Sequence, residues 1–401
     1  MGPVDFPLRR QTLLLDEPRL PQDFVSAARA AGMRPDPDAP DLALFHSRRP
    51  AAAAGLLTRN HFPGAPILLA RERLAAGHLR TVVVNARFSN VATGPGGLQD
   101  AREMAELAAR ETGVSPEEVL VGSTGIIGRR LPMDRIRRGI QGMGEALASD
   151  VWPAARAILT TDTHPKVVSA RVDGAILTAV GKGAGMVSPN LATMLVYLFT
   201  DAAVPAPDLD RMLRSAAARS FQVLSIDTDT STSDMVVALA NGAAGDVSGD
   251  SFQAALDAVC LRMAELVARD GEGATKLLRV QVSGAVDRGE GGRIARSVAD
   301  SPLVKTMAYG ADPNVGRLLM AVGKCVSCRV VPERVRITLQ GVEVIRNGVP
   351  VDFPEARVRE LLGGDPVDVR IDLGVGSGEG MALGCDLTEG YVEENAAYAS
   401  S

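Results

Sequence analysis

Apolar residues along this chain follow two periods, one of about two residues, typical of strands, and one of about 3.6, typical of helices. Residues 80–86, RTVVVNA, form a short apolar run that predicts a buried strand. In residues 97–113, Met104 and Leu107 fall on one helical face, and Gly113 is suited to end the helix. Such segments alternate without a low-complexity linker or a repeat of fixed period, which predicts one compact α/β body.

Two dipeptides predict β-hairpins. Asp173-Gly174 stands between the β-rich runs of residues 166–183, and both positions tolerate the positive φ angles of a two-residue turn. Asn347-Gly348 predicts a second hairpin for the same reason. A long amphipathic helix is expected between them, and further strands are expected near the end of the chain. These segments are residues 251–271 for the helix and residues 276–284, 333–341 and 367–374 for the strands.

Composition and charge then exclude several classes of protein. The 401 residues are 46% apolar, enough for a substantial core, and 43 basic against 48 acidic residues give a net charge of -5. This balance does not favour nucleic acid or an anionic membrane, and one Trp, four Tyr and nine Phe offer few faces for stacking bases. The first residues lack the apolar core of a signal peptide, and no uncharged stretch could cross a bilayer. We expect a cytoplasmic protein with a small-molecule substrate.

The usual catalytic and metal motifs are not found. Cysteines at 260, 325, 328 and 385 are too few for a disulfide framework, and the Cys325-Cys328 CxxC lacks the second pair of a zinc site, so we expect reduced structural thiols. The four histidines are scattered. The run from Asp227 resembles a calcium loop, but Thr232 stands at its glycine position. Gly183 follows Lys182 where a phosphate loop needs Ser or Thr.

Residues 182–202, KGAGMVSPNLATMLVYLFTDA, set Thr193 between a glycine-rich lead and an apolar run. Such a threonine can be buried at the start of a strand or helix, or it can be a nucleophile if a base removes its proton. Cleavage before Thr193 would free an α-amino group with a pKa of about 7.7–8.0 as that base. Ala192 leaves the scissile carbonyl uncrowded, and an oxyanion would need donors such as the free backbone N–H groups expected in the glycine-rich loop Ser123-Thr124-Gly125.

The chain resembles the ornithine acetyltransferase family, also called the glutamate N-acetyltransferases, over nearly its whole length. Besides the segment around Thr193, the matching motifs are VATG, EEVLVGSTGIIG, LPMD, ILTTDTHPK, DTDTSTSD, DGEGATK, SPLVKTMAYGADPNVGR, GCDLTEGYV and the terminal ENAAYASS. So many ordered matches are specific to a family. The resemblance implies an α/β fold of the layered sandwich type that the family shares with self-activating aminopeptidases.

The resemblance also implies a precursor that cuts itself between Ala192 and Thr193. The products would be an α chain of residues 1–192 and a β chain of residues 193–401, interleaved in one folded body, with a dimer of such αβ units expected. Thr193 would take an acetyl group from N-acetylornithine and pass it to glutamate in a ping-pong cycle of arginine biosynthesis. Neither a metal nor an organic cofactor is implied, although some family members use acetyl-CoA as the acyl donor.

Further positions match residues of the family's site. Thr124 and Gly125 match its oxyanion-hole pair. Lys182 suits a substrate carboxylate, and Glu272 suits a substrate ammonium group. The positions that match substrate contacts are Thr160, for which Thr161 is an alternative, Lys182, Thr193, Glu272, Asn395 and Ser400.

Three departures from the family pattern leave the substrate open. NARFSNVATG, which contains Arg87, stands in place of a run like NSGNANACTG, Val315 stands in place of a tryptophan, and DTDTSTSD replaces DGDTSTND. The last variant, with an arginine near position 87, resembles the paralogue found with clavulanic acid biosynthesis, so a specialised-metabolite N-acetyltransferase is one alternative. A second is an amidohydrolase or aminopeptidase of the same fold, in which water resolves the acyl-enzyme. A third is an unprocessed binding or regulatory protein.

Overall fold

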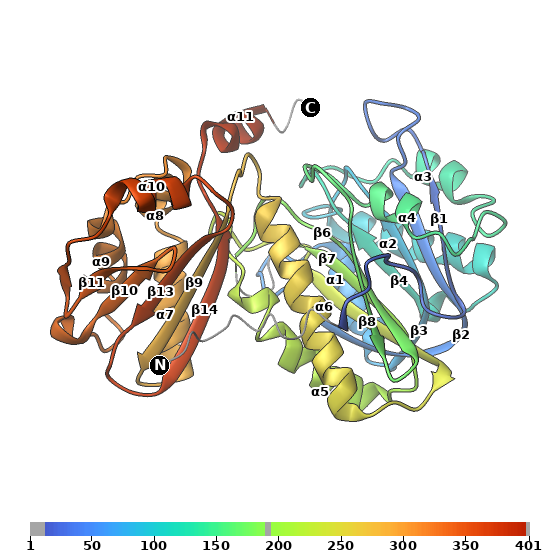
Figure 1. Ribbon diagram of the computed structural model, residues 1–401. Coiled ribbons are helices and arrows are strands. Elements are labelled where there is room, and N and C mark those ends of the chain that lie inside the picture. The colour runs from blue at the N-terminus through green and yellow to red at the C-terminus, as the bar shows by residue number, and fades with distance from the viewer. Residues whose placement is uncertain (1–12, 189–193, 398–401) are drawn as a thin grey trace. The chain divides into compact units, whose positions relative to one another are not determined.

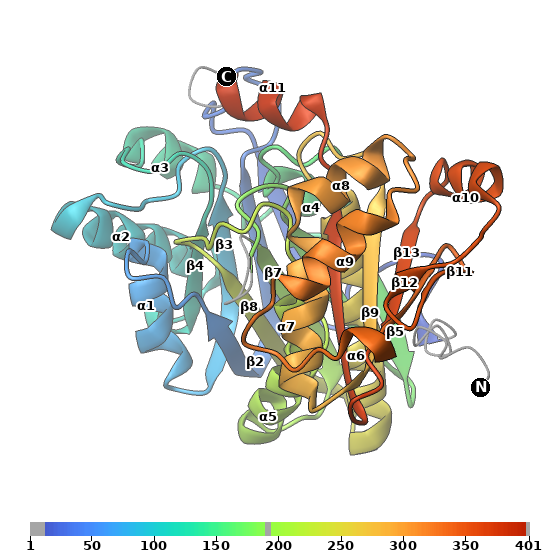
Figure 2. The ribbon, with the colours of Figure 1, turned by 90° about the vertical axis from the view of Figure 1, so that its left-hand side faces the viewer.

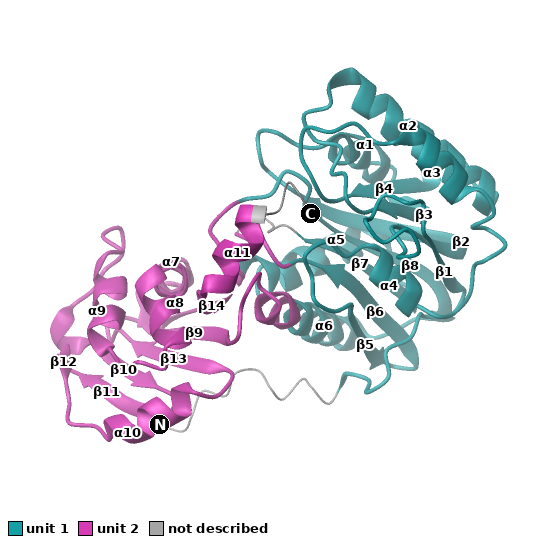
Figure 3. Ribbon diagram, turned by 90° about the horizontal axis from the view of Figure 1, so that it is seen from above, with its two compact units in different colours: residues 1–183, 190–222, 230–263 teal, residues 184–189, 223–229, 264–401 magenta. Residues whose placement is uncertain are grey.

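The structure is a computed structural model that describes residues 13–188 and 194–397 (Figure 1). The chain divides into two compact units, coloured separately in Figure 3. Unit 1 comprises residues 1–183, 190–222 and 230–263, and unit 2 comprises residues 184–189, 223–229 and 264–401. Both units combine a sheet with helices, so the predicted α/β class is confirmed.

Unit 1 contains an eight-stranded sheet in the order β4-β3-β2-β8-β7-β6-β5, with β1 paired to β2. Its pairs are antiparallel except β3 with β4 and β7 with β8, which are parallel. The strands are β1 (Phe24–Arg29), β2 (Leu42–Leu57), β3 (His78–Asn85), β4 (Val119–Ser123), β5 (Lys166–Val172), β6 (Ala175–Lys182), β7 (Leu195–Ala202) and β8 (Met235–Gly245).

Alternate residues of β2 pack into two different cores of unit 1. Leu42 and Leu44 belong to a cluster with helices α2 and α3, whereas Ala43 and Phe45 belong to a cluster with α4. Because side chains alternate between the faces of a strand, the sheet is covered on both faces. The helices are α1 (Ala65–Leu74), α2 (Gly94–Thr112), α3 (Met133–Ile140), α4 (Trp152–Ala157), α5 (Ala206–Ala217) and α6 (Gly249–Arg269), the last of which continues into unit 2.

Local sequence signals predicted several elements of unit 1 correctly. The apolar run RTVVVNA lies in β3, and α2 ends at Gly113, whose φ of 66° is left-handed. The turn between β5 and β6 has φ angles of 46° at Asp173 and 95° at Gly174, as the hairpin prediction requires.

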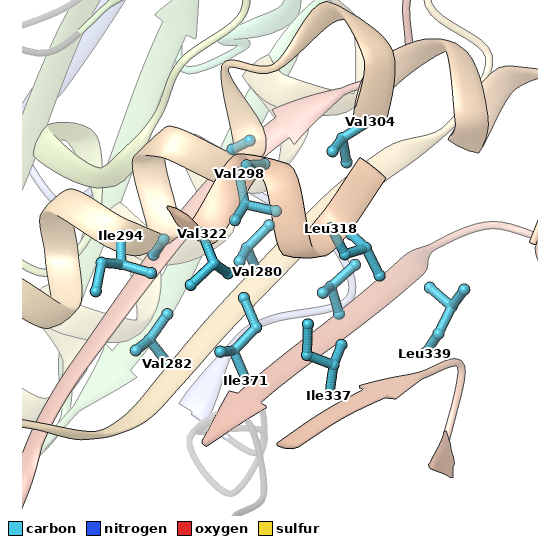
Figure 4. Close-up of a cluster of buried hydrophobic side chains, with 14 of the residues drawn as sticks. Val280, Val282, Ile294, Val298, Val304, Leu318, Val322, Ile337, Leu339 and Ile371 are labelled. Carbon is cyan, nitrogen blue, oxygen red and sulfur yellow. The ribbon is translucent and has the colours of Figure 1, made fainter. Parts of the chain in front are cut away.

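Unit 2 contains a six-stranded sheet in the order β12-β11-β10-β13-β9-β14. Figure 2 shows α7 and α9 in front of this sheet, and Figure 4 shows the apolar core in which Ile294 and Val298 of α7 pack with Val280, Val282 and Ile371 of the strands. The strands are β9 (Leu277–Ala285), β10 (Arg336–Leu339), β11 (Val342–Arg346), β12 (Val349–Pro350), β13 (Val367–Asp372) and β14 (Gly378–Cys385). The helices are α7 (Arg288–Ala299), α8 (Pro302–Tyr309), α9 (Val315–Gly323), α10 (Glu355–Leu362) and α11 (Glu389–Ala397).

The two units do not coincide with the two predicted chains. Residues 184–188 of the predicted α chain fall in unit 2, and residues 194–222 of the predicted β chain fall in unit 1. Each predicted chain therefore contributes to both units, while the cleavage itself stays a prediction. Among the helices of the described residues, none is both long and apolar enough to cross a membrane.

Candidate active site

The predicted nucleophile Thr193 and its neighbour Ala192 lie outside the described residues, as does Ser400. The chain on both sides of the predicted cleavage bond is described. Strand β6 ends at Lys182, β7 begins at Leu195, and these two residues stand opposite each other in an antiparallel pair. The segment with the predicted cleavage bond therefore connects two neighbouring strands of the unit 1 sheet.

Thr124 and Gly125 follow β4, and their donor groups differ in availability. The Thr124 N–H donates to the Asn85 carbonyl at 3.1 Å, because the parallel pairing of β3 and β4 continues past the strand end. The expectation of a free N–H at Thr124 is therefore wrong. The Thr124 hydroxyl and the Gly125 N–H make no hydrogen bond to any residue that the structure describes. These two groups can serve a developing oxyanion.

Gly125 occupies a position that admits no side chain. Its φ is 128°, and a Cβ atom there would lie 2.2 Å from the carbonyl carbon of Arg87. The Arg87 carbonyl also accepts the Ile126 N–H at 3.0 Å, and Arg87 itself has a φ of 75°. The run NARFSN, which departs from the family pattern, thus shapes the loop that presents the Gly125 N–H.

Thr160 and Lys182 are brought together in unit 1 by a buried network. The Lys182 Nζ donates to the Thr160 Oγ1 at 2.7 Å and lies 3.7 Å from a carboxylate oxygen of Asp162. The Lys166 Nζ donates to the other oxygen of Asp162 at 2.7 Å. Burial works to raise the pKa of Asp162, but the charges of Lys182 and Lys166 outweigh it and hold this pKa below its ordinary value. Asp162 therefore remains ionised between two cations.

Glu272 and Asn395 meet in unit 2. The Asn395 Nδ2 donates to the Glu272 Oε2 at 2.9 Å, although the residues are far apart in sequence. The Glu272 N–H donates to the Ala184 carbonyl at 2.9 Å, which fixes the loop that carries it. Next to it, Gly273 has a φ of 67°, and a Cβ atom there would lie 2.3 Å from the Tyr391 nitrogen of α11. The glycine thus permits α11 to approach Glu272, and the role of both side chains as substrate contacts stays a prediction.

Asp227, the first residue of the acidic run, binds backbone N–H groups. The Asp227 carboxylate accepts the N–H groups of Met186 and Val187 at 2.5 and 2.8 Å, within unit 2. It therefore anchors the glycine-rich lead, in which Met186 has a left-handed φ of 54°. Within residues 13–188 and 194–397, no three His, Cys, Asp or Glu side chains gather as metal ligands. All four cysteines are free thiols, as expected.

Asp234 is a residue that the sequence interpretation did not single out. It is buried directly before β8, and its Oδ1 accepts the backbone N–H of Met194, the residue after the predicted nucleophile, at 3.1 Å. The Met194 carbonyl accepts the Met235 N–H, so the contact continues the parallel pairing of β7 and β8. Burial raises the pKa of Asp234 well above its ordinary value, against the opposing effects of the Met194 N–H, the Ser231 hydroxyl and the Lys182 charge. The pairing of β7 with β8 brings this carboxyl group next to residue 194, although the two residues are far apart in the sequence.

Comparison with known proteins gives matches over nearly the whole chain. The ArgJ family matches residues 25–400. An arginine biosynthesis bifunctional protein ArgJ of Thermus thermophilus is 46% identical over 384 residues, 95% of this chain and 99% of that protein. The glutamate N-acetyltransferase Oat2 of Streptomyces clavuligerus is 43% identical over 396 residues, 96% of this chain and 99% of that protein. An arginine biosynthesis bifunctional protein ArgJ 2 of a Nostoc species is 41% identical over 382 residues, 95% and 98% of the two chains.

Proposed function

The chain belongs to the ArgJ family, and on that premise we propose that it transfers an acetyl group from N-acetylornithine to glutamate through Thr193. The observation that carries this activity is the 43% identity with a glutamate N-acetyltransferase along 96% of the chain. The nucleophile is generated by self-cleavage between Ala192 and Thr193. This cleavage leaves the free α-amino group that the hydroxyl needs as its base.

The proposed reaction proceeds in two half-reactions. The Thr193 hydroxyl attacks the acetyl carbonyl carbon of N-acetylornithine while its proton passes to the Thr193 α-amino group. The resulting oxyanion accepts hydrogen bonds from the Thr124 hydroxyl and the Gly125 N–H, the two donors that no described residue uses. The C–N bond then breaks, ornithine leaves with the proton, and the acetyl group remains on Thr193 as an ester. The glutamate amine attacks this ester and restores the free hydroxyl.

Substrate recognition is assigned to charged side chains that match the family's substrate contacts. We propose that Lys182 binds a substrate carboxylate, because its Nζ lies in a network of two lysines and one ionised carboxylate. Glu272 offers a carboxylate to the substrate ammonium group, and Asn395 orients it through the 2.9 Å hydrogen bond. Thr160 and Ser400 complete the proposed contacts, the latter outside the described residues.

This chemistry needs neither a metal nor an organic cofactor, and acetyl-CoA remains an acyl donor to be tested. We further propose that the processed protein is a cytoplasmic dimer of αβ units. The four free thiols accord with a reducing compartment. Light scattering of the processed protein tests the dimer.

The first test is cleavage. Intact-mass measurement and N-terminal sequencing are expected to give two chains for the wild type, the second beginning at Thr193, and one uncut chain for the Thr193→Ala variant. Acetyl transfer from N-acetylornithine is then followed with and without glutamate. Acetate release that does not depend on an acceptor amine would identify a hydrolase instead. An uncut and inactive wild type would overturn the proposal as a whole.

One observation favours a second candidate, a specialised-metabolite acetyltransferase. The loop around Gly125 is shaped by Arg87, part of the run that departs from the family pattern. A panel of amino-acid acceptors distinguishes the two functions. Ordinary selectivity for glutamate would rule out the second.

A further inference from the structure

Cys325 and Cys328, the CxxC pair in the loop after α9 of unit 2, lie within bonding reach of each other. The Cys325 carbonyl accepts the Cys328 N–H at 3.0 Å, which closes a turn of four residues. Such a turn holds its first and last Cα atoms less than about 7 Å apart, and a disulfide spans Cα atoms about 4.4–6.8 Å apart. The two sulfur atoms are 3.1 Å apart. A disulfide can therefore form here with little movement of the backbone.

The two sulfur atoms differ in their hydrogen bonds. The Cys328 Sγ accepts from the Cys325 thiol at 3.1 Å and from the Arg293 Nε of α7 at 3.4 Å. Its other contacts, with the Glu290 carbonyl at 3.9 Å and the Ser327 hydroxyl at 4.0 Å, are longer and weaker. The two shorter contacts, one of them with a cation, make Cys328 the sulfur that is better placed to react as a thiolate.

The surroundings of Cys325 suit a thiol that keeps its proton. Burial and the hydrogen bond with Cys328 raise the pKa of Cys325. Cys325 also comes two residues after the end of α9 at Gly323. The C-terminal end of a helix carries a partial negative charge, which disfavours an anion there. The pair therefore combines one sulfur placed to attack with a second thiol beside it.

Access from solvent separates this pair from the other two cysteines. Cys325 and Cys328 are half-buried, and Val326 between them is 93% exposed. Cys260 and Cys385 are buried, and burial raises the pKa of both thiols. Because the thiolate is the reactive form of a cysteine, the buried thiols should be inert. The chain thus contains two inert cysteines with which the reactivity of the pair can be compared.

We propose that Cys325 and Cys328 form a reversible oxidation site whose oxidant is hydrogen peroxide. The Cys328 thiolate attacks one peroxide oxygen, the O–O bond breaks, and the other oxygen leaves as hydroxide, which takes up a proton to become water. Cys328 is then a sulfenic acid. The Cys325 sulfur attacks the Cys328 sulfur, the S–O bond breaks, and the hydroxyl group leaves as water with the Cys325 proton. One peroxide is reduced to two waters while two thiols become a disulfide, which a dithiol reductant reverses. None of these steps requires cleavage of the chain or acetyl transfer.

The test is peptide mapping of the native full chain after exposure to hydrogen peroxide and alkylation. Trypsin cuts after Lys324 and Arg329, so both cysteines of the pair fall in one peptide, residues 325–329. We expect this peptide to be unalkylated and lighter by two hydrogen atoms, and dithiothreitol to restore both thiols. Cys260 and Cys385 should be alkylated in full once the protein is denatured. A peptide that keeps both thiols, a change that dithiothreitol does not reverse, or equal oxidation of the buried cysteines would overturn the inference.

Two serine variants test the order of the steps. In Cys325→Ser, the sulfenic acid on Cys328 has no thiol beside it, so dimedone should trap it after exposure to peroxide. In Cys328→Ser, the remaining thiol of Cys325 should give the dimedone adduct at least about 10 times more slowly. Adducts that form equally fast in the two variants would contradict the assignment of Cys328 as the attacking sulfur.

Arg293→Gln tests the cation beside the Cys328 sulfur. The Glu290 carboxylate, 3.9 Å from an Arg293 nitrogen, already offsets part of this charge. We therefore expect disulfide formation to slow only about 3-fold, since a smaller thiolate population is partly compensated by its greater nucleophilicity. Arg288→Gln is the matched control, because Arg288 is also exposed on α7 and makes no hydrogen bond to either thiol among the described residues. Equal rates in the two variants would remove Arg293 from the site and with it the reason for attack by Cys328.

Discussion

Polar groups near the strand ends of unit 1 are paired in one region and unpaired in another. At the end of β6, the carboxylate of Asp162 contacts Lys166 and Lys182, and Lys182 also contacts Thr160. At the end of β4, the Thr124 hydroxyl and the Gly125 N–H have no partner among the described residues. Paired groups stabilise the fold, whereas unpaired ones remain available to a substrate. The comparison predicts that substitutions in the first region change stability and substitutions in the second change rate.

The largest expected effect is on stability, from Asp162→Asn. This change removes the carboxylate that lies between two buried lysines, so we expect the free energy of unfolding to fall by about 3–5 kcal/mol. Urea unfolding measures it. The control is Asp208→Asn, which breaks an exposed pair with Arg211 and should cost at most about 1 kcal/mol. Equal losses in the two variants would contradict the assignment of stability to the first region.

A large effect on rate is expected from Thr124→Val. The valine keeps the shape of the side chain and removes a hydroxyl that contacts no described residue, so kcat should fall about 100- to 1,000-fold. The free energy of unfolding should hardly change. Thr124→Ser keeps the hydroxyl and should retain most of the activity. A valine variant as active as the serine variant would exclude the hydroxyl as an oxyanion donor.

A smaller effect is expected from Thr160→Val. The substitution removes one hydrogen bond from the Lys182 ammonium group, which is worth about 1.5–3 kcal/mol when the donor is charged. Because Lys182 keeps Asp162 beside it, we expect the loss to lie at the lower end of that range. Michaelis constants for both substrates, measured beside urea unfolding, show whether Lys182 has also moved. Unchanged stability and unchanged Michaelis constants would show that the bond has no role.

The smallest expected effect is the opposite response of two carboxyl groups to acid. The pKa of Asp162 is lower in the folded than in the unfolded protein, so its ionised form adds to the free energy of unfolding. This stabilisation is complete above about pH 3.9 and is lost on acidification, by about 1 kcal/mol at pH 3. The pKa of Asp234 is raised by burial, so acidification protonates it and removes the free-energy cost of a buried negative charge. Urea unfolding from pH 6 to pH 3 should show wild type losing stability relative to Asp162→Asn and gaining it relative to Asp234→Asn. Parallel curves would contradict both directions.

Local structure was predictable from the sequence because its causes are local. The hairpin at Asp173-Gly174 depends on the φ angles that two residues tolerate, and the end of α2 depends on Gly113. The division into two units was not predictable in this way. Both units contain the same kinds of strand and helix, and only contacts between distant segments separate them.

The candidate site shows the same limit. The resemblance to a family placed Lys182 and Glu272 among the site residues, but neither the Thr160 contact nor the Asn395 contact follows from local pattern. The expectation of a free Thr124 N–H was wrong because strand pairing continues beyond β4. Asp234 was missed because its contact with Met194 depends on the parallel pairing of strands about forty residues apart.

The strand order of the unit 1 sheet has a consequence for the cut protein. Strands β7 and β8 of the predicted β chain stand between β6 and β2 of the predicted α chain, so the polypeptides would be joined along two hydrogen-bonded seams. The predicted cleavage would then turn one molecule into a heterodimer without opening the sheet. Unfolding of the native protein remains unimolecular, whereas its reassembly becomes second order and slows on dilution. The uncut precursor would refold at a rate independent of concentration, so the predicted cleavage would make refolding of the enzyme much less efficient than its first folding.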